Sequence, residues 1–134
     1  MENYSEKLAE VREIFRGDKF ATENGMVIDE IGDHYAKCSV ELGDVHRNAM
    51  GGVMGGVHFT LADFAFAVAA NWQHMGTVAL STDIAFIGAV KGNHLTAEAK
   101  LIKDGRSVCC YHIMVTDELG NIAADVKTVG FHKC

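Results

Sequence analysis

The segment of residues 46–63 contains two glycine pairs followed by an acid. Gly55 and Gly56 stand just before a long apolar run, which begins at Val57 and contains a single acid, Asp63. A glycine pair at the start of a helix exposes backbone N–H groups that an approaching ligand can reach. A carboxylate in an apolar helix is costly unless it is used or satisfied. The segment therefore predicts a site that binds a carbonyl oxygen and places a carboxylate near it.

The spacing of these groups indicates how many chains the site needs. Gly55 and Asp63 are eight residues apart (63 minus 55), which is roughly 12 Å along a helix that rises 1.5 Å per residue. Attack on a carbonyl carbon requires contacts of about 3 Å, and the acid cannot easily make them to a carbonyl held by Gly55 of its own chain. We therefore expect a homodimer with two shared sites, each taking Gly55 from one subunit and Asp63 from the other.

Hydrophobic periodicity predicts the elements that carry this segment. Residues 5–16 place their apolar side chains on one helical face, and the apolar run predicts a long helix from about 55 to 73. Strand-like patterns occupy residues 26–31, 34–42, 77–87, 94–103, 106–116 and 121–131. A helix that is apolar nearly all round must be buried on most sides. We expect one α+β domain over 1–134, with an N-terminal helix in 1–17 and an antiparallel sheet wrapped around the long central helix.

Strand 77–87 is apolar on both of its predicted faces. Simple alternation groups Val78, Leu80, Ile84 and Phe86 on one face, and Ala79, Ala85 and Ile87 on the other. A strand that is buried on both faces needs a second layer or a second subunit over the sheet. The pattern is a second indication of an oligomer.

Composition limits the classes of partner and compartment. The formal net charge of −6 over 134 residues opposes binding to nucleic acid or to an anionic membrane. The apolar run carries Asp63 and is too short to span a membrane comfortably. The first seven residues of the sequence, Met-Glu-Asn-Tyr-Ser-Glu-Lys, lack the pattern of a signal peptide, so we expect a cytoplasmic protein. We expect reduced thiols at all of the cysteines, which are Cys38, Cys109, Cys110 and Cys134.

Motifs for metal or nucleotide binding are not found in the sequence. The seven histidines form no H-E-x-x-H motif and no ligand spacing with cysteine. No G-x-G-x-x-G opens a βαβ unit, and no G-x-S-x-G nucleophile elbow occurs. We therefore expect no metal and no separate cofactor.

The glycine-bearing segment resembles a known family signature. Residues 46–56 read H-x-N-x-x-G-x-x-M-G-G and are followed by Leu-Ala-Asp at 61–63. This pattern resembles hotdog-fold acyl-CoA thioesterases of the phenylacetate-pathway (PaaI) type, and S-T-D-I-x-F-I at 81–87 is similar to their next strand. The resemblance covers about 34–131. It departs at Met54, where the family usually has a histidine, and a thioether cannot replace the hydrogen bonding of that histidine.

The resemblance implies an enzyme that hydrolyses an acyl- or aryl-CoA thioester to a carboxylic acid and free CoA. Asp63 would act as general base or as nucleophile, and the Gly55 N–H would polarise the carbonyl. Asn48 would donate its amide to the thioester oxygen, unless it only caps its own turn. Ser81 would help to hold the attacking water, unless it is a plain sheet serine. Tight helix packing is the alternative role for Gly55, and a purely structural acid is the alternative for Asp63.

The resemblance also implies a set of substrate contacts and an assembly. The expected substrate-binding residues are His46, Met54, Gly56, Phe59 and Arg106, and the CoA phosphates could also meet Arg47, Lys91 or Lys103. We expect His58, in the first helical turn, to be structural or to face the rim. CoA is part of the substrate, so no cofactor is implied. The implied assembly is a homodimer or a dimer-of-dimers tetramer.

Two other functions are compatible with a hotdog fold. A non-catalytic dimer that binds acyl-CoA as a sensor is favoured by Met54, whereas Asp63 argues against it. A dehydratase or hydratase would pair an aspartate with a histidine in one short motif ahead of the helix, and this chain has no such pair.

Overall fold

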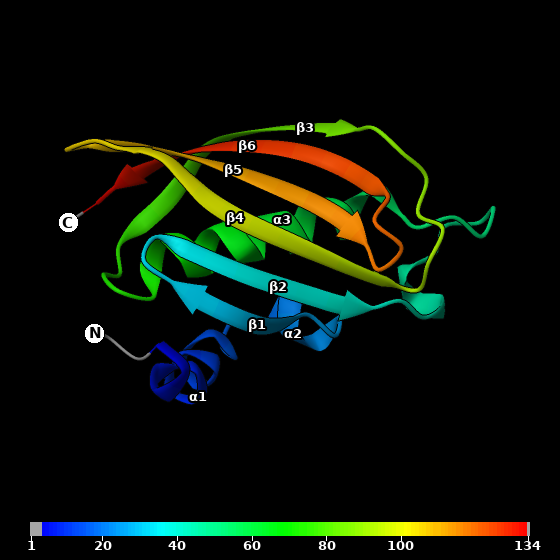
Figure 1. The fold of residues 1–134 in the computed structure, drawn as a ribbon, viewed down its shortest axis with the longest axis horizontal. Coiled ribbons are helices and arrows are strands. Elements are labelled where there is room, and N and C mark those ends of the chain that lie inside the picture. The colour runs from blue at the N-terminus through cyan, green and yellow to red at the C-terminus, as the bar shows by residue number, and fades with distance from the viewer. Residues whose placement is uncertain (1–3, 134) are drawn as a thin grey trace.

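A 17-residue helix, α3 (Gly55–Asn71), lies in the hollow of a curved sheet (Figure 1). The computed structural model describes residues 4–133. The strands are β1 (Val27–Gly32), β2 (Tyr35–Glu41), β3 (Thr77–Phe86), β4 (His94–Asp104), β5 (Val108–Asp117) and β6 (Ile122–His132). They are antiparallel throughout, in the order β1-β2-β4-β5-β6-β3. The expected α+β architecture, with a sheet wrapped around a central helix, is confirmed.

Alternation along the strands explains why the sheet curls around α3. On β4, Leu95, Ala97 and Ala99 are fully buried, while the residues between them are partly exposed. The small side chains on this inner face let the helix approach the sheet closely. Leu61 and Ala65 of α3 are equally buried, so the helix and the inner face of the sheet share one apolar core.

Three short elements complete the chain. The N-terminal helix α1 (Tyr4–Phe15) packs against β1. It confirms the helix predicted within residues 1–17, of which residues 1–3 lie outside the described part of the chain. Helix α2 (Lys19–Glu23) and the 3₁₀ turn η1 (Asp44–His46) were not predicted. Elements this short span barely more than one turn, so they leave no readable hydrophobic period.

One prediction about β3 is wrong. A bulge lies between Ala79 and Ser81, so Leu80 is an extra residue in the strand. It shifts the alternation, and Val78 therefore lies on the opposite face from Ile84 rather than on the same one. Moreover, β3 is an edge strand and most of its side chains are exposed in the single chain. A covering layer or subunit remains a prediction.

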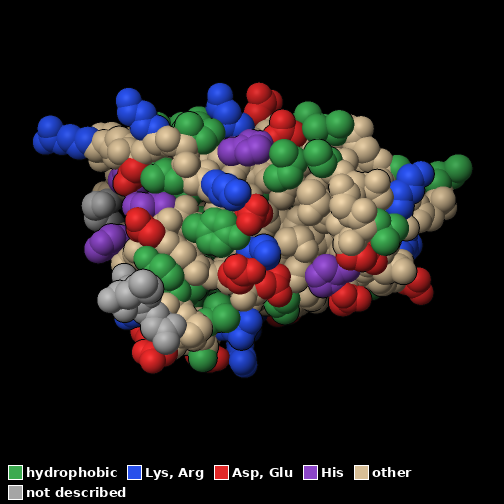
Figure 2. Space-filling view, viewed as in Figure 1, with side chains coloured by type: hydrophobic (Ala, Val, Ile, Leu, Met, Phe, Trp, Pro, Cys, Tyr) green, Lys and Arg blue, Asp and Glu red, His purple; other side chains and the backbone are tan. Residues whose placement is uncertain are grey.

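The outer face of the sheet is polar over β1, β2 and β4. The sheet lies in front of α3 in Figure 1, and Figure 2 shows acidic and basic side chains interspersed on this face. The Lys37 ammonium lies 2.9 Å from the Glu30 carboxylate, and the Tyr35 hydroxyl donates to Glu98 at 2.5 Å. This part of the sheet surface is therefore suited to water.

Two further expectations concern reduced cysteines and the lack of a membrane-spanning segment. Cys38, Cys109 and Cys110 are free thiols, and the first two are buried; Cys134 lies outside the described residues. Between residues 4 and 133, no helix is both long enough and apolar enough to cross a membrane.

Candidate active site

Helix α3 begins with two glycines whose N–H groups make no hydrogen bond to a carbonyl within the helix. Met54 precedes the helix in an extended conformation (φ −65, ψ 135), and its N–H donates to the His46 carbonyl at 2.9 Å. The Val57 N–H donates to the Met54 carbonyl, also at 2.9 Å. The N–H groups of Gly55 and Gly56 lie in the first turn, where a helix offers no carbonyl partner. They form a donor pair at the positive end of the helix dipole.

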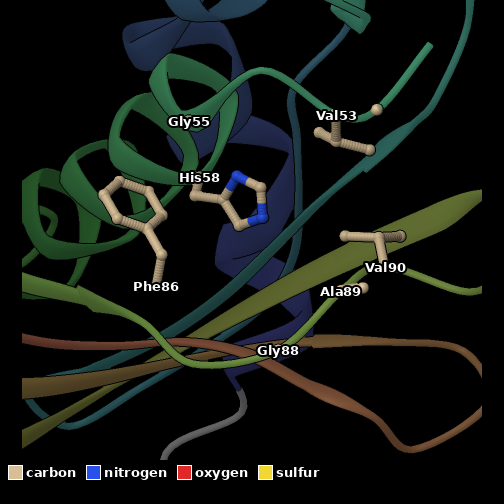
Figure 3. A pocket seen from close by; sticks show the side chains of 8 residues that line it. Val53, Gly55, His58, Phe86, Gly88, Ala89 and Val90 are labelled. Carbon is tan, nitrogen blue, oxygen red and sulfur yellow. The ribbon is translucent and has the colours of Figure 1, made fainter. Parts of the chain in front are cut away.

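A cavity of about 390 Å³ lies beside Gly55. Its lining comes from the loop before α3, from α3 itself and from the end of β3 with the segment that follows: Gly52, Val53, Gly55, His58, Phe86, Gly88, Ala89 and Val90 (Figure 3). A Cβ placed on Gly55 would lie only 3.2 Å from the ring of Phe86. Glycine at this position therefore keeps both the cavity and the backbone donor accessible.

His58 faces this cavity, whereas its place in the first helical turn predicted a rim-facing or structural role. Its ring contacts Phe86 edge to face, with the ring centroids 5.6 Å apart, and Figure 3 shows it pointing into the cavity. Its Nδ1 lies 3.3 Å from the Met54 carbonyl. Because a carbonyl only accepts, Nδ1 carries the proton and Nε2 of the neutral ring presents a lone pair. Burial lowers the pKa of His58, which favours this neutral form.

The sequence did contain a signal for His58. It follows Gly55 by three residues, so the two lie on the same side of the first helical turns. The family resemblance predicts a histidine at position 54, where this chain has methionine.

The loop before α3 is held by His46 and Asn48. The buried His46 ring accepts from the Gly43 N–H at Nδ1 (2.9 Å) and donates from Nε2 to the Asn24 carbonyl (2.7 Å). The exposed Asn48 uses Oδ1 to accept from the N–H groups of Met50 (3.0 Å) and Gly52 (3.1 Å). His46 therefore shapes the loop, and the oxygen of Asn48 caps its own turn.

A second, smaller cavity of about 180 Å³ lies on the other side of the helix start. Three of the predicted substrate-binding residues line it, namely His46, Met54 and Gly56. The two glycines of the pair thus face different cavities, because neighbouring helix residues differ by about 100° around the axis.

Asp63 lies at the centre of an open stripe along α3. Beyond the first turn, the residues of α3 that are not buried are Phe59, Thr60, Asp63, Ala67 and Ala70. Their spacing places them on one face of the helix. Burial, and secondarily the like charge of Asp18, raise the pKa of Asp63. Asp63 does not line the cavity beside Gly55, so one chain does not bring the two groups together.

Ser81 lies on the outer face of the sheet. Its neighbour Thr82 points inward and contacts the buried Thr128, with the two hydroxyl oxygens 3.2 Å apart. Ser81 is exposed and points the other way, on the same face as Asp83. Within one chain it is therefore separated from Gly55 by the sheet.

The cationic candidates divide between the two ends of α3. Arg47 donates to the Gly51 carbonyl at 3.3 Å, and Lys91 follows the cavity residue Val90, so both lie near Gly55. Lys103 and Arg106 lie in or next to the β4–β5 hairpin, which borders the opposite end of α3 (Figure 1). Arg106 could reach the Gly55 cavity only from another subunit.

Comparison with known proteins places this geometry in a family. The family model of the Thioesterase superfamily matches residues 50–124, more than half of the chain. The chain is 30% identical over 115 residues to "Putative esterase" of Archaeoglobus fulgidus, covering 85% of this chain and 75% of that protein.

Solved structures share the fold. The PaaI protein of the phenylacetic acid degradation operon of Escherichia coli superposes with a TM-score of 0.88 at 24% identity, covering 97% of this chain and 96% of that one. A hypothetical thioesterase of Streptococcus pneumoniae TIGR4, solved with coenzyme A, gives a TM-score of 0.80 at 20% identity over 88% of this chain and 95% of that one. This chain therefore belongs to the thioesterase superfamily, as a thioester hydrolase with the hotdog fold.

Proposed function

We propose that this enzyme is an acyl-CoA thioesterase whose active site is shared between two subunits. One subunit supplies the Gly55 N–H and its cavity, and the other supplies Asp63. The observation that carries the proposal is the placement of Asp63 on the open stripe of α3, away from the cavity beside Gly55. The coenzyme A in the similar S. pneumoniae structure supports CoA as the thiol part of the substrate.

The chemistry follows from the groups on the two sides of the site. The Gly55 N–H and the helix dipole bind the thioester oxygen and stabilise its negative charge as water attacks the carbonyl carbon. Asp63 of the partner subunit takes a proton from that water. The carbon–sulfur bond then breaks, and the CoA thiolate leaves with the proton that Asp63 returns. The alternative, direct attack by the carboxylate, would form an anhydride that water then cleaves.

The cavity supports an apolar acyl group of modest size. Val53, Phe86, Ala89 and Val90 give it a hydrophobic lining, and its volume is about 390 Å³. An aryl or medium-chain acyl group matches this chemistry. The Nε2 lone pair of His58 can accept a hydrogen bond from the attacking water, which would position it against the carbonyl.

The proposed dimer uses the two apolar surfaces that the single chain leaves open. The stripe on α3 includes Phe59, which is 41% exposed, and the edge strand β3 exposes Leu80 (59%) and Phe86 (58%). An edge strand also presents unpaired backbone groups that a second copy can pair with. A two-fold axis along this edge would bring each Asp63 toward the other subunit.

The test is an acyl-CoA panel in which released thiol is measured for the wild type and for Asp63→Asn. We expect turnover of an aryl- or medium-chain acyl-CoA, reduced at least about a hundredfold in the variant. Asp83→Asn is the matched control, because Asp83 is exposed on the outer face of β3, and it should keep full activity.

The other outcomes of this panel decide against parts of the proposal. Equal rates for the wild type and Asp63→Asn would remove Asp63 from the mechanism. Tight binding of acyl-CoA without turnover by the wild type would favour the sensor, the function that Met54 in place of the family histidine suggests.

A further inference from the structure

A second polar site lies at the opposite end of α3 from Gly55. A cavity of about 260 Å³ there is lined by residues that include His34, Thr77, Asp104, Tyr111 and His132. None of these residues has a place in the proposed thioesterase mechanism.

Three strand ends converge beside this cavity. Asp104 ends β4 and pairs with Cys109 of β5, while the N–H of His132, at the end of β6, donates to the Ser107 carbonyl at 2.9 Å. As a result, one ligand atom from each of Asp104, Cys109 and His132 lies within 4.8 Å of the other two. A carboxylate oxygen, a thiol sulfur and an imidazole nitrogen are thus neighbours at this end of the sheet.

Two histidine rings are oriented toward the same carboxylate. The Nδ1 of His132 lies 2.8 Å from the Thr77 hydroxyl, and the Nδ1 of His34 lies 3.3 Å from the Tyr111 hydroxyl. Their Nε2 atoms face Asp104, at 2.7 Å from Oδ1 for His132 and 4.0 Å from Oδ2 for His34. The His34 Nε2 also lies 3.7 Å from Oδ1 of the exposed Asp33. Histidines that bind metals are commonly held in this way, with the second ring nitrogen fixed by a polar neighbour.

The position of His34 is fixed by the β1–β2 turn. Its backbone has φ of 50, a left-handed conformation that a side-chain-bearing residue seldom adopts. Gln73, just after α3, accepts from the His34 N–H and donates to the Asp33 carboxylate, both at 3.1 Å. The hairpin is thereby attached to the end of the helix, and the strained residue is held beside Asp104.

We propose that Asp104, Cys109, His132 and His34 form a binding site for a divalent transition metal, with Zn²⁺ as the best match. The four donors are two imidazole nitrogens, one sulfur and one carboxylate oxygen, a set that suits tetrahedral Zn²⁺. Bonds of about 2.0–2.3 Å place neighbouring ligands roughly 3.3–3.8 Å apart. Asp104, Cys109 and His132, whose ligand atoms lie within 4.8 Å of one another, reach this spacing if their side chains move by about 1 Å. A rotation of the His34 ring, whose Nε2 lies 4.0 Å from Asp104, completes the set. The bound ion would link the ends of β4, β5 and β6 to the β1–β2 turn.

The sequence predicts no metal site, because no histidine or cysteine ligands stand at metal-binding spacing along the chain. Here the four donors are spread from residue 34 to residue 132 and come from a turn and three strands. Such a set is brought together by the sheet register alone, so spacing motifs do not detect it.

The experiment uses the full chain, stripped with a chelator and titrated with Zn²⁺ by calorimetry and with Co²⁺ by absorption spectroscopy. We expect one ion per chain, a higher Tm with Zn²⁺, and a thiolate-to-Co²⁺ charge-transfer band. Asp104→Asn and His132→Gln should each weaken binding at least about tenfold, and Thr77→Val, which frees the His132 ring, by about tenfold or more. Cys109→Ser should remove the charge-transfer band.

Matched controls lie on the outer face of the same strand. Cys110 is the neighbouring thiol, and His112 forms a histidine–aspartate pair with Asp125 that is not part of the three-residue cluster. Cys110→Ser and His112→Gln should bind as the wild type does. Because Asp104 is exposed, Asp104→Asn should fold normally even if Cys109→Ser does not. The proposal is overturned if Zn²⁺ and Co²⁺ do not bind, if Asp104→Asn and His132→Gln bind unchanged, or if the control variants lose binding equally.

Discussion

At the scale of single residues, Asp63 carries an energetic cost that the proposed mechanism explains. Its pKa is raised, because burial and the like charge of Asp18 disfavour the ionised form. A raised pKa in the folded state means that the native protein loses stability as the pH rises above the pKa of a free aspartate, about 3.9. Retaining such a group is typical of a site in which activity is favoured over stability.

We therefore expect Asp63→Asn to be more stable than the wild type at pH 7. The gap should narrow as the pH falls toward about 3.9, where the wild-type carboxyl is also protonated. Thermal denaturation of both proteins across this range measures it. A variant that is less stable at pH 7 would show instead that the carboxylate makes a stabilising contact, such as an ion pair across the dimer.

His58 lines the cavity beside Gly55, a position that the sequence did not predict. His58→Phe keeps an aromatic ring against Phe86 but removes Nε2 from the cavity, so we expect a small change in Tm and a fall in kcat of at least about tenfold. His74→Phe, at an exposed histidine that follows α3 and does not line this cavity, is the control for loss of an imidazole. Unchanged kcat in His58→Phe would return His58 to a purely structural role.

At the scale of elements, the segment after β3 is positioned by a distant aspartate. The carboxylate of Asp117 accepts from the N–H groups of Lys91 (2.8 Å) and Gly92 (3.2 Å). It also accepts from the N–H groups of Leu119 and Asn121 and from the Asn121 side chain, all within 3.0 Å. One side chain thus holds the β5–β6 turn against the segment that carries the cavity residue Val90.

We expect Asp117→Asn to lower Tm and to raise KM more than it lowers kcat, because the cavity wall loosens while Gly55 and Asp63 stay in place. The hydrogen bonds, that of the Asn121 side chain first, lower the pKa of Asp117. Its stabilisation is therefore complete above the unfolded pKa of about 3.9 and is lost as the pH falls through the folded pKa. The Tm difference between the two proteins should shrink in acid, and a constant difference would contradict this account.

Local pattern predicted the elements well, and long-range contacts explain what it missed. Strand 94–103 is predicted, and β4 spans His94–Asp104. The prediction succeeds because the alternation of apolar and polar residues can be read directly from the sequence. The bulge at Leu80 cannot be predicted from the alternation of residue types, since it depends on the pairing of β3 with β6. The link from Asp117 to Lys91 joins residues 26 apart, and no local pattern encodes it.

At the scale of the whole molecule, the distribution of polarity indicates where a second copy would bind. Figure 2 shows side chains of both charges on the outer face of the sheet. Over β1 and β2 they include the pair of Lys37 with Glu30. By contrast, the open stripe on α3 and the edge of β3 expose Phe59, Leu80 and Phe86. Helix geometry alone predicted that Asp63 and Gly55 must come from different chains, and the cavities on α3 support the same conclusion. The position of the axis could not be derived, because edge strands are defined only by the sheet order.

Subunit complementation tests the shared site directly. Gly55→Val should inactivate by filling the space beside the Phe86 ring, which a Cβ would already approach to 3.2 Å, and Asp63→Asn should inactivate by removing the base. When the two variants are unfolded, mixed equally and refolded together, half of the dimers combine them. Each mixed dimer then holds one site with both native groups, so activity should return to about a quarter of the wild-type level.

The control mixes Asp63→Asn with the double variant, Gly55→Val with Asp63→Asn, from which no complete site can arise. Activity in the first mixture and none in the second requires two chains at one site. If the first mixture stays inactive although light scattering shows mixed dimers, both groups act within one chain, and α3 would have to bend or unwind to bring Asp63 within about 3 Å of the carbonyl. A protein that stays monomeric at micromolar concentration would exclude the shared site altogether, because no second chain would then bring Asp63 to a Gly55 N–H.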